Sequence, residues 1–315
     1  AGTRAVGSRI KAGELLARSG EIISPDVAAR IASGNVSAVQ VFCKPKVAFI
    51  PTGNELVCAG GHIAEGKNIE TNSLLVRGKV EEWGGISQIY DVVPDNPEAI
   101  VRAVRQACET ADIVVLNAGS SKGSDDWSVE QLEEIGEVIC HQTNHGPGHH
   151  SSYAMVDGTP IVGISGPPLG ASFTLDFYLR PLIRLYLGLE PELPRIPVRL
   201  LAAFHASSSS AKVVSYKTAD GTAASGNAAS DTTASEVISL PGETRPSVVT
   251  DPDAVFYSVK FLNVSVGADG VLQGVPLAGR PGSAEAEGAS ACYMMPTGAG
   301  TSAPQVGDII EVELC

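Results

Sequence analysis

The sequence has no cysteine pair of the kind that binds a metal or forms a redox motif. Six cysteines occur, and no two are separated by only two residues, which excludes a zinc knuckle and a thioredoxin-like site. Cys108, Cys140 and Cys292 lie within apolar runs. Cysteines in such runs are typical of small core residues in a reducing compartment.

Long apolar runs and positive charge are also scarce. No stretch of about 18 apolar residues and no signal-peptide pattern occurs, so we expect a cytoplasmic protein that does not enter a membrane. The 22 Lys and Arg residues against 35 Asp and Glu give a formal net charge of −13. Nucleic-acid binding depends on clustered Lys and Arg, so we expect none. Backbone N–H groups can still bind one small phosphate ligand.

What remains is an ordinary globular composition with 43% hydrophobic residues, in a chain of 315 residues that has room for about two domains. Residues 1–43 are expected to be extended with one helix that starts at Ser24-Pro25, and they are too few to bury a core. An α/β domain is expected over 44–190 and a small β-barrel domain over 191–315, with Pro191, Pro194 and Pro197 as the linker. Within it, residues 205–235 are rich in Ser, Ala, Thr and Gly and predict a flexible surface excursion.

Strand and helix patterns alternate along the predicted α/β domain. Short apolar runs predict strands at 47–50, 86–93, 113–116, 138–140 and 161–164. Helices are predicted over 73–83, 97–110, 129–136 and 171–187, the second of them capped by Asn96. Strands separated by such helices indicate a three-layer, doubly wound and mostly parallel sheet.

Four turns rich in Gly, Ser, Thr and Pro follow the predicted strands, over 51–55, 117–123, 145–150 and 163–168. Ligands of doubly wound sheets bind beyond the carboxyl ends of the strands. Glycines there let the backbone approach a ligand and expose N–H groups to it. One such turn is found in any α/β fold. Four that converge over one sheet edge predict a ligand site, although they do not name the ligand.

The motifs in these turns resemble those of the MoeA and gephyrin E-domain family, the molybdopterin molybdenumtransferases. Residues 50–57 (IPTGNELV) resemble the family's S-T-G-D-E-L motif, and 70–73 (ETNS) its Y-D-[ST]-N motif. Residues 117–126 resemble S-G-G-V-S-V-G-x-x-D, and 163–171 are similar to G-L-P-G-N-P-x-S-A. The turn at 145–149 (HGPGH) stands where the family has K-P-G-K.

Both ends of the chain fit the same resemblance. Residues 307–312 resemble the last strand of the family's C-terminal barrel, and 11–14 a stretch of its first domain. Residues 1–43 are thus expected to be a remnant of that first domain. Because these flanking segments match, a relative of MogA or CinA type, which shares only the central domain, is disfavoured.

The resemblance implies a homodimer that binds molybdopterin or its adenylate and inserts molybdate with release of AMP, helped by Mg²⁺. It also implies handover of the product to a molybdoenzyme or work with a MogA-type partner. Asp126 and Glu70 would be the catalytic carboxylates and the Mg²⁺ ligands. The residues that would bind the pterin cofactor are Thr52, Gly53, Asn54, Glu55, Asn72, Gly119, Ser120, Ser121, Lys122, Gly123, Pro147, Gly148, His149, Ser165, Gly166, Pro167 and Pro168.

Several of these residues also have plain structural interpretations. Asp126 can cap a helix, and Glu55 can stabilise its own turn instead of accepting hydrogen bonds from a pterin. Asn72 and Ser73 can cap the helix that follows them. The three histidines at 145, 149 and 150 have no obvious fourth partner for a zinc site.

Two departures from the family's motifs bear on the function. Asn54 replaces an acid and cannot carry charge to a metal, and both lysines of K-P-G-K are replaced by histidines. Two lost charge-assisted hydrogen bonds would weaken an anion site by about 3–6 kcal/mol. The sequence therefore leaves two hypotheses: a molybdenum-inserting enzyme, and a non-catalytic molybdopterin carrier or scaffold of the same fold.

Lys122 offers a displaced positive charge in the second turn, where the family has an apolar residue. We expect Lys122→Ala to weaken the binding of the pterin adenylate, because a charge-assisted hydrogen bond contributes about 1.5–3 kcal/mol. Isothermal titration of both proteins would measure the change. Equal affinities would show that Lys122 does not replace the lost lysines.

Overall fold

The computed structural model describes residue 5 and residues 7–60, 63–117, 127–204, 212–217, 223–228, 255–278, 288–297 and 301–314. The chain forms two compact units. The first comprises Ala1–His141 and His150–Leu193, and the second comprises Gln142–His149 and Pro194–Cys315. The short segment Gln142–His149 thus belongs with the C-terminal part of the chain.

The first unit contains the predicted doubly wound sheet, of six strands in the order β4-β1-β5-β9-β8-β6. Its strands are β1 (Lys46–Ile50), β4 (Ile86–Ile89), β5 (Ile113–Asn117), β6 (Glu137–His141), β8 (Ser152–Val156) and β9 (Thr159–Ile164). The four strands β4, β1, β5 and β9 are parallel, and β8 runs antiparallel to both of its neighbours. The prediction of a mostly parallel sheet is confirmed, while the antiparallel strand β8 was not predicted.

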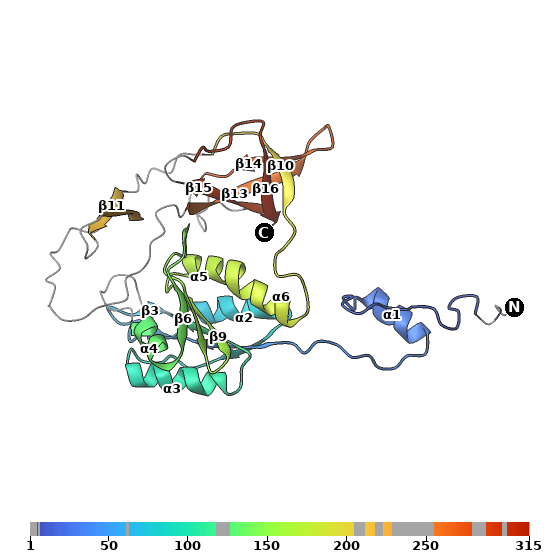
Figure 1. Ribbon diagram of the computed structural model, residues 1–315, viewed down its shortest axis with the longest axis horizontal. Helices are drawn as coiled ribbons and strands as arrows, with labels where there is room; N and C mark the ends of the chain where they lie inside the picture. Colours follow the sequence, from blue (N-terminus) through green and yellow to red (C-terminus); the bar gives the residue numbers. More distant parts are fainter. Residues whose placement is uncertain are drawn as a thin grey trace. The chain divides into compact units, whose positions relative to one another are not determined.

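Helices cover both faces of this sheet (Figure 1). They are α2 (Asn72–Glu82), α3 (Pro97–Cys108), α4 (Trp127–Ile135), α5 (Pro168–Thr174), a π-helical segment (Leu175–Leu179) and α6 (Arg180–Tyr186). Alternate residues of β1 explain the two layers. Ala48 and Ile50 pack with the apolar side chains of α3 and α4, whereas Val47 and Phe49 pack with those of α2 and of the helical run 168–186.

Local sequence signals set several helix boundaries as predicted. Ser24 accepts a hydrogen bond from the Val27 N–H at the start of α1 (Pro25–Ser33), and Asn96 accepts one from Ala99 at the start of α3. The predicted long helix 171–187 is a continuous helical run whose π-helical turn ends next to Pro181. Because proline has no N–H, the regular ladder is interrupted there, and a π turn accommodates the interruption.

The second unit is the predicted small barrel. Its strands are β7 (His145–Gly146), β10 (Ile196–Leu200), β13 (Phe256–Val266), β14 (Leu272–Pro276), β15 (Ala291–Thr297) and β16 (Ile309–Leu314). The order β14-β10-β16-β15-β13 closes because β13 also pairs with β14, and β7 adds to β13 in parallel. The core of the barrel contains Val198, Leu200, Leu262, Ala291, Ile310 and Val312.

One expectation for this part of the chain was wrong. Pro197 was assigned to the linker but lies in β10, where pairing with β14 begins only at Arg199, so its missing N–H disrupts no bond to that neighbour. Within 205–235, β11 (Lys212–Lys217) and β12 (Ala223–Ala228) pair in antiparallel fashion, and the flexible surface excursion stays a prediction. The other residues of 205–235 lie outside the described ranges.

None of the described helices is long and apolar enough to cross a membrane.

Candidate functional site

The turns that follow β1 and β9 meet the end of β5 at the carboxyl edge of the sheet. The hydroxyl of Thr52 donates to the carbonyl oxygen of Asn117 at 2.5 Å, and the Asn117 Nδ2 donates back to the Thr52 carbonyl at 3.4 Å. Both residues are buried, with exposed fractions of 3% and 6%. The turn after β1 is therefore fixed to the end of β5.

Asn72, at the start of α2, joins the turn after β9 to this pair. Its Nδ2 donates to Asn117 Oδ1 and to the carbonyl oxygen of Gly166, both at 2.9 Å. Two acceptors around one nitrogen fix the orientation of the amide, because a flipped amide would place its oxygen against two other oxygens. Asn72 is thus at the centre of a network that joins the turns after β1 and β9 to the end of β5.

Two polar atoms next to this network have no partner among the described residues. They are Asn72 Oδ1 and Ser165 Oγ, on residues with exposed fractions of only 4% and 7%. A buried polar atom without a hydrogen bond costs about 1–3 kcal/mol, so such atoms are normally satisfied by a ligand or by water. The hydroxyl can donate or accept, and the amide oxygen accepts. These two atoms are the strongest evidence for a ligand at this sheet edge.

The loop after β1 has a shape that depends on Gly53. Its φ of +146° lies where side chains rarely occur, and a Cβ would lie 2.8 Å from Glu55 Oε2 and 2.9 Å from Leu56 Cγ. The loop then continues into β2 (Leu56–Val57), which pairs with β3 (Asn68–Ile69). Gly53 therefore lets the Glu55 side chain lie close under the backbone of the turn.

Glu70, one of the two predicted catalytic carboxylates, follows β3 directly. Its Oε1 accepts a hydrogen bond from the Ser73 N–H at 2.9 Å, and its own N–H donates to Val57 at 2.9 Å. The carboxylate thus caps the first turn of α2. The predicted residues Gly119, Ser120, Ser121, Lys122, Gly123 and Asp126 lie outside the described residues.

The fourth predicted turn belongs to the barrel unit. His145 and Gly146 form β7 and pair with Tyr257 and Ser258 of β13. Pro147, Gly148 and His149 follow in the same segment, which closes on itself through a hydrogen bond from the Thr143 N–H to the His149 carbonyl at 2.9 Å. This turn is therefore built on the barrel and not on the sheet that carries the other three.

His145 does not replace the charge of the lysine found at this place in the family's motif. Its side chain has an exposed fraction of 2%, and its Nδ1 lies 3.0 Å from the carbonyl oxygen of Pro147. Burial lowers the pKa of His145 below its ordinary value, because the charged imidazolium loses its hydration. The ring is thus neutral at neutral pH.

The lowered pKa of His145 makes the stability of the barrel depend on pH. Between the folded pKa and the ordinary value of 6.5, the unfolded chain binds more protons than the folded one. The free energy of unfolding is therefore undiminished above that ordinary value and decreases as the pH falls through it. We expect hydrogen exchange of the Leu262 and Val312 amides to accelerate from about pH 7.5 to about pH 5.5, after correction for intrinsic rates. His145→Gln should flatten this dependence; an unchanged slope in that variant would contradict the assignment.

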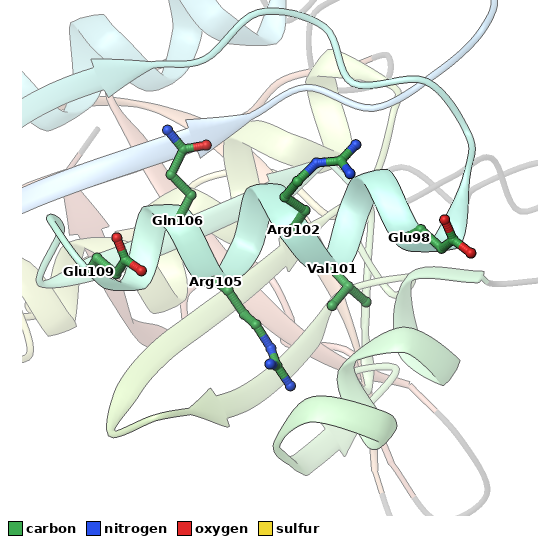
Figure 2. A pocket seen from close by; sticks show the side chains of 6 residues that line it. All are labelled: Glu98, Val101, Arg102, Arg105, Gln106 and Glu109. Atoms are coloured by element: carbon green, nitrogen blue, oxygen red, sulfur yellow. The ribbon is translucent and has the colours of Figure 1, made fainter.

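The described residues contain no group of three His, Cys, Asp or Glu side chains that could hold a metal ion. Of the two predicted Mg²⁺ ligands, the described one, Glu70, uses an oxygen to cap α2. A shallow hollow along α3 is not a second site. Its lining residues come from α3 and its C-cap Glu109, and the charged ones are exposed (Figure 2).

Comparison with known proteins agrees with the resemblance drawn from the motifs. Residues 48–185, which carry the sheet-edge network, match the family described as the probable molybdopterin binding domain. A molybdopterin molybdenumtransferase of Staphylococcus aureus is 28% identical over 191 residues, 60% of this chain and 46% of the relative. The chain is similar to the MoeA proteins, and the matched family covers residues 48–185. The family resemblance drawn from the motifs is thereby confirmed.

A further relative agrees. A putative molybdopterin biosynthesis protein of Methanocaldococcus jannaschii is 27% identical over 183 residues, 56% of this chain and 46% of the relative. The chain spans about half the length of the curated relatives it matches.

Solved structures agree on the fold. The molybdopterin biosynthesis MoeA protein from Pyrococcus horikosii covers 98% of the chain with a TM-score of 0.66 at 23% identity, the alignment spanning 64% of that protein. A molybdenum cofactor biosynthesis protein from Pyrococcus furiosus gives a TM-score of 0.59 at 18% identity, over 98% of this chain and 82% of its own. The fold predicted from the sequence, a doubly wound domain followed by a small barrel, is that of the MoeA proteins.

Proposed function

We propose that this chain acts in molybdenum cofactor biosynthesis, binding molybdopterin or its adenylate at the carboxyl ends of β1, β5 and β9 and inserting molybdate with release of AMP. The observation that carries the proposal is the pair of buried, unpartnered atoms Asn72 Oδ1 and Ser165 Oγ, inside the segment that matches the molybdopterin-binding family. Pterins present N–H and amino groups, which can donate hydrogen bonds to an amide oxygen. We also propose that the domains meet between residues 43 and 44 and between residues 190 and 191.

In this proposal the described residues bind and orient the ligand. Asn72 and Thr52 hold the turns after β1 and β9 and the end of β5 at a fixed spacing, and Glu55 accepts hydrogen bonds from the pterin's donors. Asp126 and Glu70 would hold Mg²⁺, which supplies charge neutralisation for the phosphates. Glu70 would hold the ion with a carboxylate that also caps α2 through Oε1.

The test is a direct assay of turnover. The chain is incubated with molybdopterin adenylate, molybdate and Mg²⁺, and AMP is followed by chromatography against a reaction without protein. AMP release above that background supports the proposal. Absence of both binding and release would refute it.

A second function, a molybdopterin carrier or scaffold, is favoured by two particular observations. His145 is buried and neutral where the family's motif has a lysine, and Asn54 replaces an acid. Both changes weaken the stabilisation of charge that turnover requires, whereas the network around Asn72 is intact. Tight binding of the adenylate without AMP release supports this alternative.

We also propose a homodimer in the cytoplasm that hands its product to a molybdoenzyme or works with a MogA-type partner. The family resemblance supports this proposal. Sedimentation equilibrium measures the first part: a mass of twice 32.5 kDa is expected, and a monomer across the accessible concentration range would contradict it.

A further inference from the structure

The loop after β1 is held not only by Asn117 but also by the segment that follows β4. The Tyr90 N–H donates to Phe49 at 2.9 Å and the Val93 N–H donates to Pro51 at 2.8 Å. The Gly53 N–H then donates to Val93 at 3.1 Å. The two segments thus run side by side beyond the regular ends of their strands.

Two side chains continue this pairing where the backbones separate. The Asn54 N–H donates to Asp95 Oδ2 at 3.0 Å, and the Asp95 N–H donates to Asn54 Oδ1 at 3.2 Å. Lys67 adds a third bond, from its Nζ to the Asn54 carbonyl oxygen at 2.7 Å. We call this set of three bonds between Asn54, Asp95 and Lys67 the latch.

The latch requires a neutral side chain at position 54. A carboxylate there would accept from the Asp95 N–H as well as the amide does. It would also add a second negative charge to a ring that already contains the Asp95 carboxylate, and like charges at this separation repel each other. Asparagine at 54 and aspartate at 95 are therefore matched to each other.

From this geometry we infer that Asn54 and Asp95 are positioning residues: together they set the backbone of Gly53 and Glu55 for the ligand, and Asn54 is not itself a ligand group. The inference rests on the proposed function for the identity of that ligand. It accounts for the missing acid at position 54, because the Asn54 side-chain oxygen is bonded to Asp95. Loop rigidity is thereby supplied by Asp95, which precedes the Asn96-Pro97 helix start and has no other role in the site.

Exchanging the two side chains tests the match. In Asn54→Asp, two carboxylates meet and the latch should open. In Asp95→Asn, the amide oxygen still accepts from the residue 54 N–H, so most of the latch should remain. The double variant Asn54→Asp/Asp95→Asn has the composition and net charge of the original protein and keeps all three bonds, with the carboxylate at position 54 and the amide at position 95. Asp91→Asn, at an exposed position just after β4, controls for the loss of one charge.

The first readout is hydrogen exchange of the residue 54 and residue 95 amides in the protein without ligand. Asn54→Asp should accelerate both by about five- to tenfold, the effect of losing one to two net hydrogen bonds, and the double variant should return both to within about twofold. Unchanged rates in Asn54→Asp, or no recovery in the double variant, would overturn the latch. This readout needs no ligand, so it stands even if the proposed function fails.

The second readout is AMP release. Because a loosened loop binds the adenylate less well but leaves the reacting groups in place, Asn54→Asp should raise KM by about five- to tenfold with kcat nearly unchanged, and the double variant should restore KM. A higher kcat in Asn54→Asp would show instead that residue 54 acts on the substrate. If hydrogen exchange supports the latch but the protein releases no AMP, only the proposed turnover is refuted and the latch stands.

Discussion

Asn72→Asp is expected to destabilise the α/β unit by about 3 kcal/mol or more and to abolish ligand binding. The substitution keeps the shape of the side chain but replaces the Nδ2 donor by an oxygen that faces Asn117 Oδ1 and the Gly166 carbonyl at 2.9 Å. Two buried acceptors lose their donor, and each costs about 1–3 kcal/mol. A negative charge is also placed where the exposed fraction is 4%.

The chain offers a convenient measurement of this effect. Its two tryptophans, Trp83 and Trp127, both lie in the α/β unit, so tryptophan fluorescence during urea unfolding follows that unit alone. Asn68→Asp, on exposed β3, makes the same chemical change and should shift the midpoint little. Equal midpoints for the two variants would show that Asn72 does not hold the turns together.

The parts of the fold that follow from local patterns could be predicted from the sequence. Buried parallel strands appear as continuous apolar runs such as 113–116, and the Ser24 and Asn96 caps define helix starts through bonds made within three residues. The antiparallel strand β8 was missed although a signal was present. Asp157 and Gly158 have φ values of +50° and +80° and join β8 to β9 by a two-residue turn, which an Asp-Gly pair favours.

The candidate site was harder to predict because its contacts are distant in sequence. The turns were predicted from their glycines and prolines, but the role of Asn72 depends on partners 45 and 94 residues away. Similarly, β7 is only two residues long and pairs with β13 more than 100 residues later, so no periodicity could assign the turn at 145–149 to the barrel. Side-chain roles of this kind follow from the assembled sheet and not from the motif.

Gly163→Ala is expected to destabilise the same unit by about 1–3 kcal/mol, although alanine is only one methyl group larger. Gly163 lies in β9 between Leu116 of β5 and Ser152 of β8. A Cβ at Gly163 would lie 2.0 Å from Ser152 Oγ and 3.3 Å from Ser152 Cβ. Rotation of the Ser152 hydroxyl relieves the closest contact, but the Cβ stays tight against Ser152 Cβ between two hydrogen-bonded strands. The strand end that leads to Ser165 is therefore expected to shift, so ligand affinity should fall as well.

Ser152→Ala removes the clashing atom and should rescue the variant. Within the described part of the chain the Ser152 hydroxyl is buried without a hydrogen-bond partner, so its removal alone should change stability by less than about 0.5 kcal/mol. The double variant Ser152→Ala/Gly163→Ala should therefore recover most of the loss, with a coupling energy of about 1–2 kcal/mol in a double-mutant cycle. Gly78→Ala, on the exposed face of α2 where a Cβ meets nothing within 4 Å, should instead stabilise the unit by up to about 1 kcal/mol. If the effects of Ser152→Ala and Gly163→Ala simply add, the contact between β8 and β9 does not determine why residue 163 is glycine.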